Sequence, residues 1–253
     1  MSLDRLVAIM QRLRDPVRGC EWDSVQDFAS IAPYTIEEAY EVADAIQRDD
    51  MTALADELGD LQLQVVFHAQ MAREAGHFTL DDVITGICDK LERRHPHIFG
   101  DATEGGHYLW EQIKAQERAG GDDQSALAGV ALALPALERA AKLQKRAART
   151  GFDWPDQNGP RAKIDEELAE IEEAAPEDKG EEVGDLLFAV VNFARHLKIE
   201  PEEALRQANR KFEQRFRAIE VTPGFADCDL AEMERRWQAV KAPGSAPNAP
   251  GSA

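Results

Sequence analysis

The same short motifs occur twice in the chain, in the same order, and this repeat restricts the possible folds more than any other feature of the sequence. Glu38 and Glu41, two carboxylates three residues apart, correspond to Glu167 and Glu170 in the second half. The remaining matched pairs are Trp22 with Trp154, Glu57 and Asp60 with Glu182 and Asp185, Lys90 and Arg94 with Lys211 and Arg215, and Trp110 with Trp237. The number of residues between the two members of a pair differs by a few from one pair to the next. These differences fall where loops are expected, and loops tolerate differences in length. We therefore predict a tandem duplication of one domain.

Apolar residues recur with the spacing of helices along most of the chain. No segment alternates apolar and polar residues between turns in the way that is typical of hairpin strands. The fold class is therefore predicted to be all-α. The expected helices cover residues 3–14, 35–47, 50–75, 79–94, 108–118, 137–149, 201–220 and 230–240, with an acidic helix and an apolar helix between the sixth and seventh of these. Thr35 is the expected N-cap of the second helix, with Glu38 as its capping-box partner.

Residues 119–125 (AGGDDQS) have the composition of a linker between the two copies. We predict an N-terminal domain over residues 1–120 and a C-terminal domain over residues 126–241. The tail, residues 242–253 (APGSAPNAPGSA), contains nothing that a core would bury, so we expect it to be disordered.

The formal net charge of the 253-residue chain is −19, which argues against a nucleic-acid polymer as partner because such binders need clustered Lys and Arg. The three cysteines have no metal-binding spacing and an odd count, as is typical of reduced thiols in a cytoplasmic protein. The longest stretch of low charge, residues 126–137, is too short to span a bilayer and contains a proline. We expect a soluble cytoplasmic protein without a membrane partner.

Helical spacing places Glu167 and Glu170 on one face, and it does the same for Glu182 and Asp185. If the two helices pack antiparallel, four carboxylates meet, and their mutual repulsion favours a cation between them. Oxygen ligands alone favour Mg²⁺, with Mn²⁺ as a possible substitute, over zinc or copper. The equivalent quartet in the first half would be Glu38, Glu41, Glu57 and Asp60.

The acidic residues could also form a solvated helix face or the ligands of a di-iron bundle. A solvated helix face is common in a chain with 48 acidic residues, but the recurrence of the pattern beside an apolar run favours metal binding. A di-iron bundle would use Glu-x-x-His motifs, which occur at Glu74–His77 and Glu92–His95. Gly76 and Pro96 place these two motifs at the ends of helices, which disfavours a di-iron site. The second half of the chain also lacks an equivalent Glu-x-x-His motif, which such a bundle needs on each of two facing helices.

Lys211 and Arg215 lie four residues apart on one helical face, and their recurrence beside an acidic quartet favours anchors for a polyphosphate over a solvated edge. Trp237 is interpreted either as a lid on the core or as a residue that stacks on a nucleobase. The sequence contains no motif for a serine or cysteine nucleophile and no phosphate-binding glycine loop. Any chemistry is therefore expected to be metal-assisted, with cations that polarise a phosphoryl group and activate water.

The paired acidic motifs resemble the Glu-Glu-x-x-Glu…Glu-x-x-Asp signature of the MazG nucleoside triphosphate pyrophosphohydrolases. Three further segments resemble the two-domain bacterial members of this family. They are Ile31-Ala32-Pro33-Tyr34-Thr35, Lys90-Leu91-Glu92-Arg93-Arg94-His95-Pro96-His97 and Gly151-Phe152-Asp153-Trp154. The resemblance extends from about residue 3 to residue 241. It implies an all-α homodimer in which dimerisation completes a four-helix core.

The resemblance also implies Mg²⁺-dependent hydrolysis of NTPs, ATP included, and of dNTPs to the monophosphate and pyrophosphate, by attack of water on the α-phosphorus. Its metal ligands would be Glu167, Glu170, Glu182 and Asp185, and one glutamate of this set would help to deprotonate the water. Lys211 and Arg215 would hold phosphates, and Trp237 would lie near the nucleotide. The C-terminal copy would be catalytic, and the N-terminal copy structural, regulatory or weakly active.

Two alternatives stay open at this stage. One is a non-catalytic acidic dimer in which both quartets are exposed and the repeat serves assembly. The other is a narrower hydrolase that accepts only dCTP or dUTP. The sequence also leaves open the number of metal ions per site and the activity of the N-terminal copy.

Overall fold

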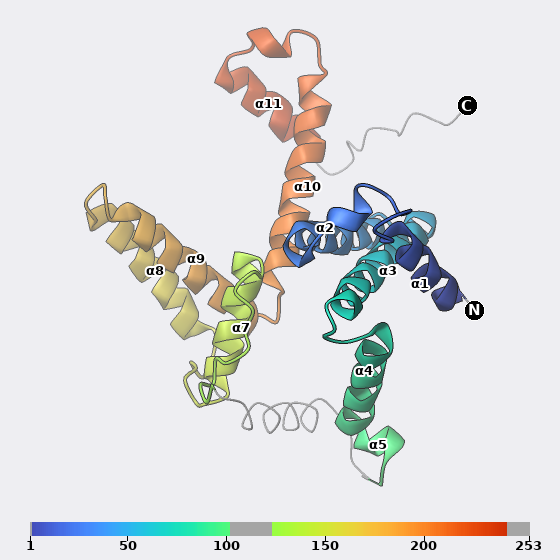
Figure 1. Ribbon diagram of the computed structural model, residues 1–253. Helices are drawn as coiled ribbons and strands as arrows, with labels where there is room; N and C mark the ends of the chain where they lie inside the picture. Colours follow the sequence, from blue (N-terminus) through green and yellow to red (C-terminus); the bar gives the residue numbers. More distant parts are fainter. Residues whose placement is uncertain (1, 102–122, 242–253) are drawn as a thin grey trace. The chain divides into compact units, whose positions relative to one another are not determined.

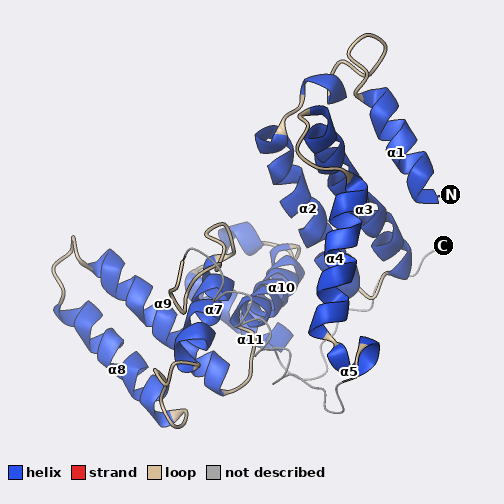
Figure 2. Ribbon diagram, turned by 60° about the horizontal axis from the view of Figure 1, so that its bottom comes forward, coloured by secondary structure: helices blue, strands red, loops and turns tan. Residues whose placement is uncertain are grey.

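The computed structural model describes residues 2–101 and 123–241, and every regular element within them is a helix. Figure 2 shows this helical architecture, which confirms the predicted all-α class. The chain divides into two compact units, Met1–Glu117 and Arg118–Ala253, which we describe separately. The helix expected over residues 108–118, most of the proposed linker and the 242–253 tail lie outside the described residues.

The first unit is built around a hairpin of two long helices, α2 and α3, against which α1 packs (Figure 1). Its elements are α1 (Ser2–Leu13), the short 3-10 helix η1 (Asp23–Val25), α2 (Phe28–Gln47), α3 (Met51–Glu74), α4 (Leu80–Arg94) and α5 (Pro96–Phe99). The core consists of buried apolar side chains from the first three α-helices, namely Met10, Ile31, Val66, Phe67 and Met71.

The predicted start of α2 at Thr35 is wrong, because the helix begins about two turns earlier. Asp27 is the N-cap: its Oδ1 accepts a hydrogen bond from Ser30 N (2.8 Å), and Ser30 Oγ accepts one from Asp27 N (2.9 Å). This capping box satisfies the first free N–H groups of the helix. Thr35 lies inside the helix, where its hydroxyl is 3.0 Å from His68 Nε2.

Other helix ends agree with the sequence analysis. Asp50 caps α3, since its Oδ1 accepts hydrogen bonds from the backbone N–H groups of residues 52 and 53. Gly76 follows that helix with φ +74°, a left-handed conformation that glycine adopts without steric cost. Thr79 caps α4 and forms a capping box with Asp82.

The second unit repeats the plan of a long helical hairpin with a shorter helix against it. Its elements are α7 (Ala136–Ala148), α8 (Asn158–Glu173), α9 (Lys179–His196), α10 (Pro201–Glu220), the short 3-10 helix η2 (Phe225–Asp227) and α11 (Leu230–Lys241). The helices α8 and α9 form the hairpin, α7 packs against α9, and α11 folds back on α10 (Figure 1). Among the described helices, none is long and apolar enough to cross a membrane.

The α8–α9 hairpin leaves much of its apolar surface uncovered within its own unit. Ala189 and Val191 are buried, but neighbouring large side chains on both helices stay 42 to 51% exposed. These exposed residues are Leu168, Val183, Leu187, Phe188 and Val190. Large apolar side chains that stay exposed together on a helical hairpin are typical of an interaction site.

Candidate metal centre and adjoining cavity

Three carboxylates of the second unit meet between α8 and α9. Glu167 comes from α8, while Glu182 and Asp185 come from α9, and one oxygen from each lies within 4.8 Å of the other two. The antiparallel packing of the two helices produces this cluster, as the spacing of the acidic residues predicts.

Glu167 is buried, with 3% of its surface exposed, and its two oxygens differ in environment. Lys163 Nζ lies 2.7 Å from Oε1, whereas Oε2 is buried without a hydrogen-bond partner. A buried carboxylate oxygen without a partner is energetically costly unless a cation or donor contacts it. The orphaned oxygen, in a set of ligands that consists only of carboxylates, fits a hard divalent cation such as Mg²⁺.

Glu170, the fourth member of the predicted quartet, lies beside this cluster on α8. Desolvation and a hydrogen bond shared with Glu167 raise the pKa of Glu170, and the positive charge of Lys163 opposes this effect. Lys163 itself is held by Glu166 as well as Glu167, and these hydrogen bonds raise its pKa. A permanently charged ammonium group therefore lies next to the acidic cluster.

The first unit contains the corresponding cluster, which is formed by Glu38, Glu41 and Glu57. Asp60, the fourth residue of the predicted quartet, is near enough for its charge to act on Glu38. The pKa of Glu38 is raised first by burial and then by the negative charge of Asp60. Gln64 Nε2 donates a hydrogen bond to Glu38 Oε1 (3.3 Å). Both copies of the repeated motif thus place three carboxylates together, although the first unit uses Glu41, the counterpart of Glu170, and not the counterpart of Asp185.

The predicted phosphate and nucleotide residues lie elsewhere in the second unit. Lys211 and Arg215 are on α10 and Trp237 is on α11, a hairpin that diverges from α8 and α9 (Figure 1). Trp237 packs against Phe212, with 5.3 Å between ring centroids, and the Arg215 guanidinium lies 6.0 Å from its ring. None of the three lines the cavity beside the acidic cluster.

That cavity has a volume of about 750 Å³ and lies between α7, α8, α9 and the loop of residues 149–157. Glu167 and Asp185 of the acidic cluster belong to its wall, and so does Lys163. The apolar part of the wall consists mainly of Leu143, Phe152, Trp154, Pro160 and Phe188. A cavity of this size that is mostly apolar, with a few polar groups, is typical of a small-molecule site.

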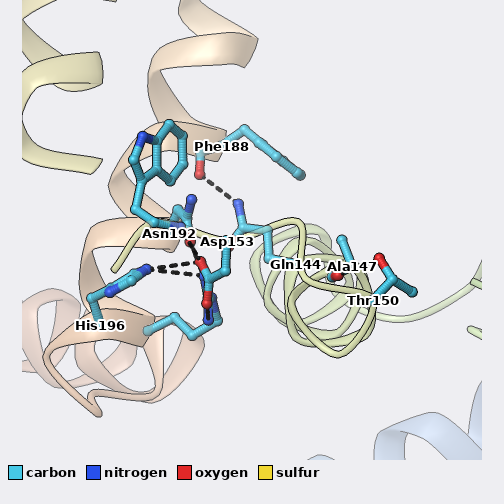
Figure 3. A network of polar contacts seen from close by, with 9 residues as sticks. Gln144, Ala147, Thr150, Asp153, Phe188, Asn192 and His196 are labelled. Carbon is cyan, nitrogen blue, oxygen red and sulfur yellow. Dashed lines mark hydrogen bonds and ion pairs between the residues drawn. The ribbon is translucent and has the colours of Figure 1, made fainter. Parts of the chain in front are cut away.

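A polar network fixes another part of the wall (Figure 3). Asp153 Oδ2 accepts a hydrogen bond from Arg195 Nη1 (2.9 Å), and Asp153 Oδ1 lies 3.0 Å from His196 Nε2. The hydrogen bond from Arg195, together with His196, lowers the pKa of Asp153 to about 2. Arg195 Nε also donates to Asn192 Oδ1 (3.0 Å), so the network ties the loop to α9.

The residues of this network were not predicted from the sequence. The string Gly151-Phe152-Asp153-Trp154 contributed to the family resemblance, but nothing in its spacing predicted the partners of Asp153. Lys163 precedes Glu167 by four residues, which is the helical spacing of an ion pair, and this signal was available from the sequence.

Comparison with known proteins identifies the family. The model of the MazG nucleotide pyrophosphohydrolase domain matches residues 26–99 and 161–219, and each segment contains one of the acidic clusters. The chain belongs to the MazG family. The match in two segments, together with the repeated helical plan, also confirms the predicted tandem duplication.

Relatives in this family are similar over most of the chain. A nucleoside triphosphate pyrophosphohydrolase of Escherichia coli strain K12 is 52% identical over 95% of this chain and 97% of its own length. The Thermotoga maritima nucleoside triphosphate pyrophosphohydrolase/pyrophosphatase MazG is 49% identical over 86% of this chain and 85% of its own length. A nucleoside triphosphate pyrophosphohydrolase of Mycobacterium tuberculosis is 34% identical over 81% of this chain and 59% of its own length.

Proposed function

We propose that this MazG protein is a Mg²⁺-dependent nucleoside triphosphate pyrophosphohydrolase. It converts NTPs, ATP included, and dNTPs to the monophosphate and pyrophosphate. The observation that carries the proposal is the buried, unpartnered Oε2 of Glu167 in a cluster of carboxylates at the wall of a cavity. The printed names of the E. coli and T. maritima relatives support the same activity.

In this proposal Glu167, Glu182 and Asp185 hold the cation, and Glu170 completes the set of ligands. Mg²⁺, or Mn²⁺ in its place, polarises the phosphoryl group and lowers the pKa of water when it is bound. A water oxygen attacks the α-phosphorus, and the bond from that phosphorus to the oxygen that bridges the α- and β-phosphates breaks. Pyrophosphate leaves with this oxygen, and a glutamate carboxylate of the set takes the proton from water.

The residues on α10 and α11 complete the site in a homodimer. Lys211 and Arg215 bind the β- and γ-phosphates, and Trp237 lies near the nucleotide. The half-exposed apolar side chains of α8 and α9 support this arrangement, because a second copy would cover them and complete a four-helix core. We infer that the C-terminal domain, residues 126–241, is the catalytic one, and that the N-terminal domain, residues 1–120, is structural, regulatory or weakly active.

Release of pyrophosphate from a panel of NTPs and dNTPs, with Mg²⁺ present, tests this function. The double variant Glu182→Gln/Asp185→Asn is expected to abolish release, whereas Glu57→Gln in the first unit leaves most of it. Loss from Glu57→Gln alone would move the active site to the first unit. Turnover of dCTP or dUTP alone would favour the narrower hydrolase, and a dimer that releases no pyrophosphate would favour the assembly protein.

A further inference from the structure

The segment that precedes α7 contains a turn, residues 125–128, which we call the strap. Asp123 Oδ1 accepts a hydrogen bond from Ser125 N (2.9 Å), and Ser125 Oγ accepts one from Leu127 N (3.1 Å). The backbone closes the turn, since the Ser125 carbonyl oxygen accepts a hydrogen bond from Ala128 N (3.0 Å). The strap therefore has a defined shape although it belongs to no helix.

Arg146, on α7, binds the backbone of the strap. Its Nη1 donates to the carbonyl oxygen of Ala128 (2.8 Å) and, at a longer distance, to that of Ala126 (3.4 Å). A charged donor makes stronger hydrogen bonds than a neutral one, and the planar guanidinium gives them a fixed direction. One side chain that contacts two carbonyl groups of a single turn restrains both its position and its orientation. Arg146 therefore clamps the strap onto α7.

The clamp places Leu127 at the cavity of the second unit. In the sequence this residue lies between the two clamped carbonyl groups, and its side chain belongs to the cavity wall together with Leu143 and Ala147 of α7. Leu127 is 43% exposed, so its own unit covers it only partly. A half-exposed aliphatic side chain in a cavity wall gains burial when an apolar group enters the cavity.

The first unit uses the corresponding arginine differently. Arg14 lies eight residues before Trp22, as Arg146 lies eight residues before Trp154. Arg14 Nη1 donates to the carbonyl oxygen of Asp23 (2.6 Å), which directly follows Trp22. Each unit thus fastens a turn with this arginine, and in the second unit the fastened turn precedes the helix and reaches the cavity wall. This difference separates a structural role, which both units share, from a role at the cavity.

We propose that Arg146 is a positioning residue for substrate binding, because it clamps the strap so that Leu127 covers the apolar part of a nucleotide in the cavity. The proposal rests on the proposed function, in which the acidic cluster at the same wall binds the phosphates. An aliphatic side chain packs against a ring or sugar and not against a phosphate, so Leu127 contributes to binding and not to cleavage. Arg146 acts through Leu127.

Steady-state release of pyrophosphate from ATP by the full-length protein, with Mg²⁺ present, tests this role. Arg146→Met and Leu127→Ala are each expected to raise KM about fivefold and to leave kcat within about twofold, because both remove contact with bound substrate and not with the reacting atoms. Arg146→Lys keeps one charged donor and is expected to restore part of the affinity. Lys142→Met, which removes a cation that pairs with Glu138 on the same helix, is the matched control and should behave as the wild type.

The double variant shows whether the two residues act together. If Arg146 acts through Leu127, then Arg146→Met raises KM little further once Leu127 is alanine. A KM raised by the product of the two single effects, about 25-fold, would show that they act independently and would overturn the proposal. Hydrogen exchange of the peptide that covers residues 123–130 is expected to be faster in Arg146→Met than in the wild type, and unchanged in Lys142→Met.

The exchange and kinetic measurements separate the ways in which the proposal can fail. Unchanged exchange in Arg146→Met would overturn the clamp itself. Faster exchange with an unchanged KM would overturn the role in substrate binding, since the clamp would then be structural alone. Pyrophosphate release with wild-type KM values in both single variants removes this proposal and leaves the proposed function in place. A wild-type protein that releases no pyrophosphate from any nucleotide removes both.

Discussion

At the scale of single residues, Glu167 is the side chain on which the candidate metal centre most depends. We predict that Glu167→Gln lowers Mg²⁺ affinity and reduces pyrophosphate release at least about 100-fold, because an amide replaces the charge of a buried ligand. Asp165→Asn on the same helix is the control, since Asp165 is exposed and pairs with Arg161. Calorimetric titration with Mg²⁺ and a pyrophosphate assay measure both effects. Equal losses in the two variants would show a general effect of charge.

Asp153 gives a prediction about pH. Its pKa in the folded protein is about 2, below the ordinary value of 3.8, because Arg195 and His196 favour the ionised form. The stabilisation is therefore fully present above pH 4 and is lost as the pH falls through 2. Asp153→Asn is expected to lower the free energy of unfolding by about 2 kcal/mol at pH 7, and by much less at pH 2.5. Urea unfolding at both pH values measures the difference, and a deficit that did not change with pH would contradict the assigned cause.

At the scale of elements, the start of α2 shows why helix ends are hard to predict from sequence. Two segments carry plausible capping residues, Asp27 with Ser30 and Thr35 with Glu38, and the structure uses the first. We predict that Asp27→Ala lowers the free energy of unfolding by about 1 kcal/mol through loss of the cap. Denaturant unfolding of the full-length protein gives the value. A loss from Thr35→Ala with none from Asp27→Ala would show that the helix begins at Thr35 in solution.

In the first turn of α8, replacing a glycine by alanine is predicted to destabilise the protein, the reverse of the usual effect. Replacing a glycine by alanine within a helix normally stabilises it by up to about 1 kcal/mol. At Gly159, however, an added Cβ would lie 2.0 Å from Cδ1 of Trp154, a ring that lines the cavity. Gly159→Ala is therefore expected to destabilise the protein by about 1–3 kcal/mol and to change its near-ultraviolet circular dichroism.

Gly180→Ala, in the first turn of α9, is the matched control, because an added Cβ there meets nothing within 4 Å. This variant should be as stable as the wild type or slightly more stable. Thermal unfolding of the two variants separates the gain in helix propensity from the cost of the clash with Trp154. If Gly159→Ala were as stable as Gly180→Ala, then Trp154 would be free to move, and its position would not define the cavity wall.

At the scale of the whole molecule, the repeated motifs predict those features of the fold and site that depend only on the spacing of residues within a helix. Glu-x-x-Asp on α9 and the glutamates of α8 follow helical periodicity, so the acidic clusters could be expected once the helices were assigned. The cavity could not, because it depends on the packing of α7 against α9 and on the loop that Asp153 ties to α9. The recurrence of Lys211 and Arg215 predicts phosphate contacts beside the acidic cluster, but spacing alone does not show how they reach it, since they lie on a separate hairpin.

The proposed homodimer would bring the two groups of residues together, and complementation between inactive variants tests it. We predict that Leu187→Arg, on the exposed apolar surface of α9, converts a dimer to a monomer in analytical ultracentrifugation, because the surface then carries a charge. Asp185→Asn and Lys211→Ala are each expected to lose most pyrophosphate release. If the basic residues act on the acidic cluster of the partner copy, subunit exchange between these two variants restores one intact site in each mixed dimer.

Random mixing of equal amounts then gives about a quarter of the wild-type activity, since half of the dimers are mixed and each of these has one working site of two. If each chain supplied both Lys211 and Asp185 to its own site, every site in the mixture would carry one of the two substitutions. No activity would then return, whatever the extent of exchange. The mixture therefore distinguishes a site shared between copies from a site within one copy, even where the isolated variants behave alike.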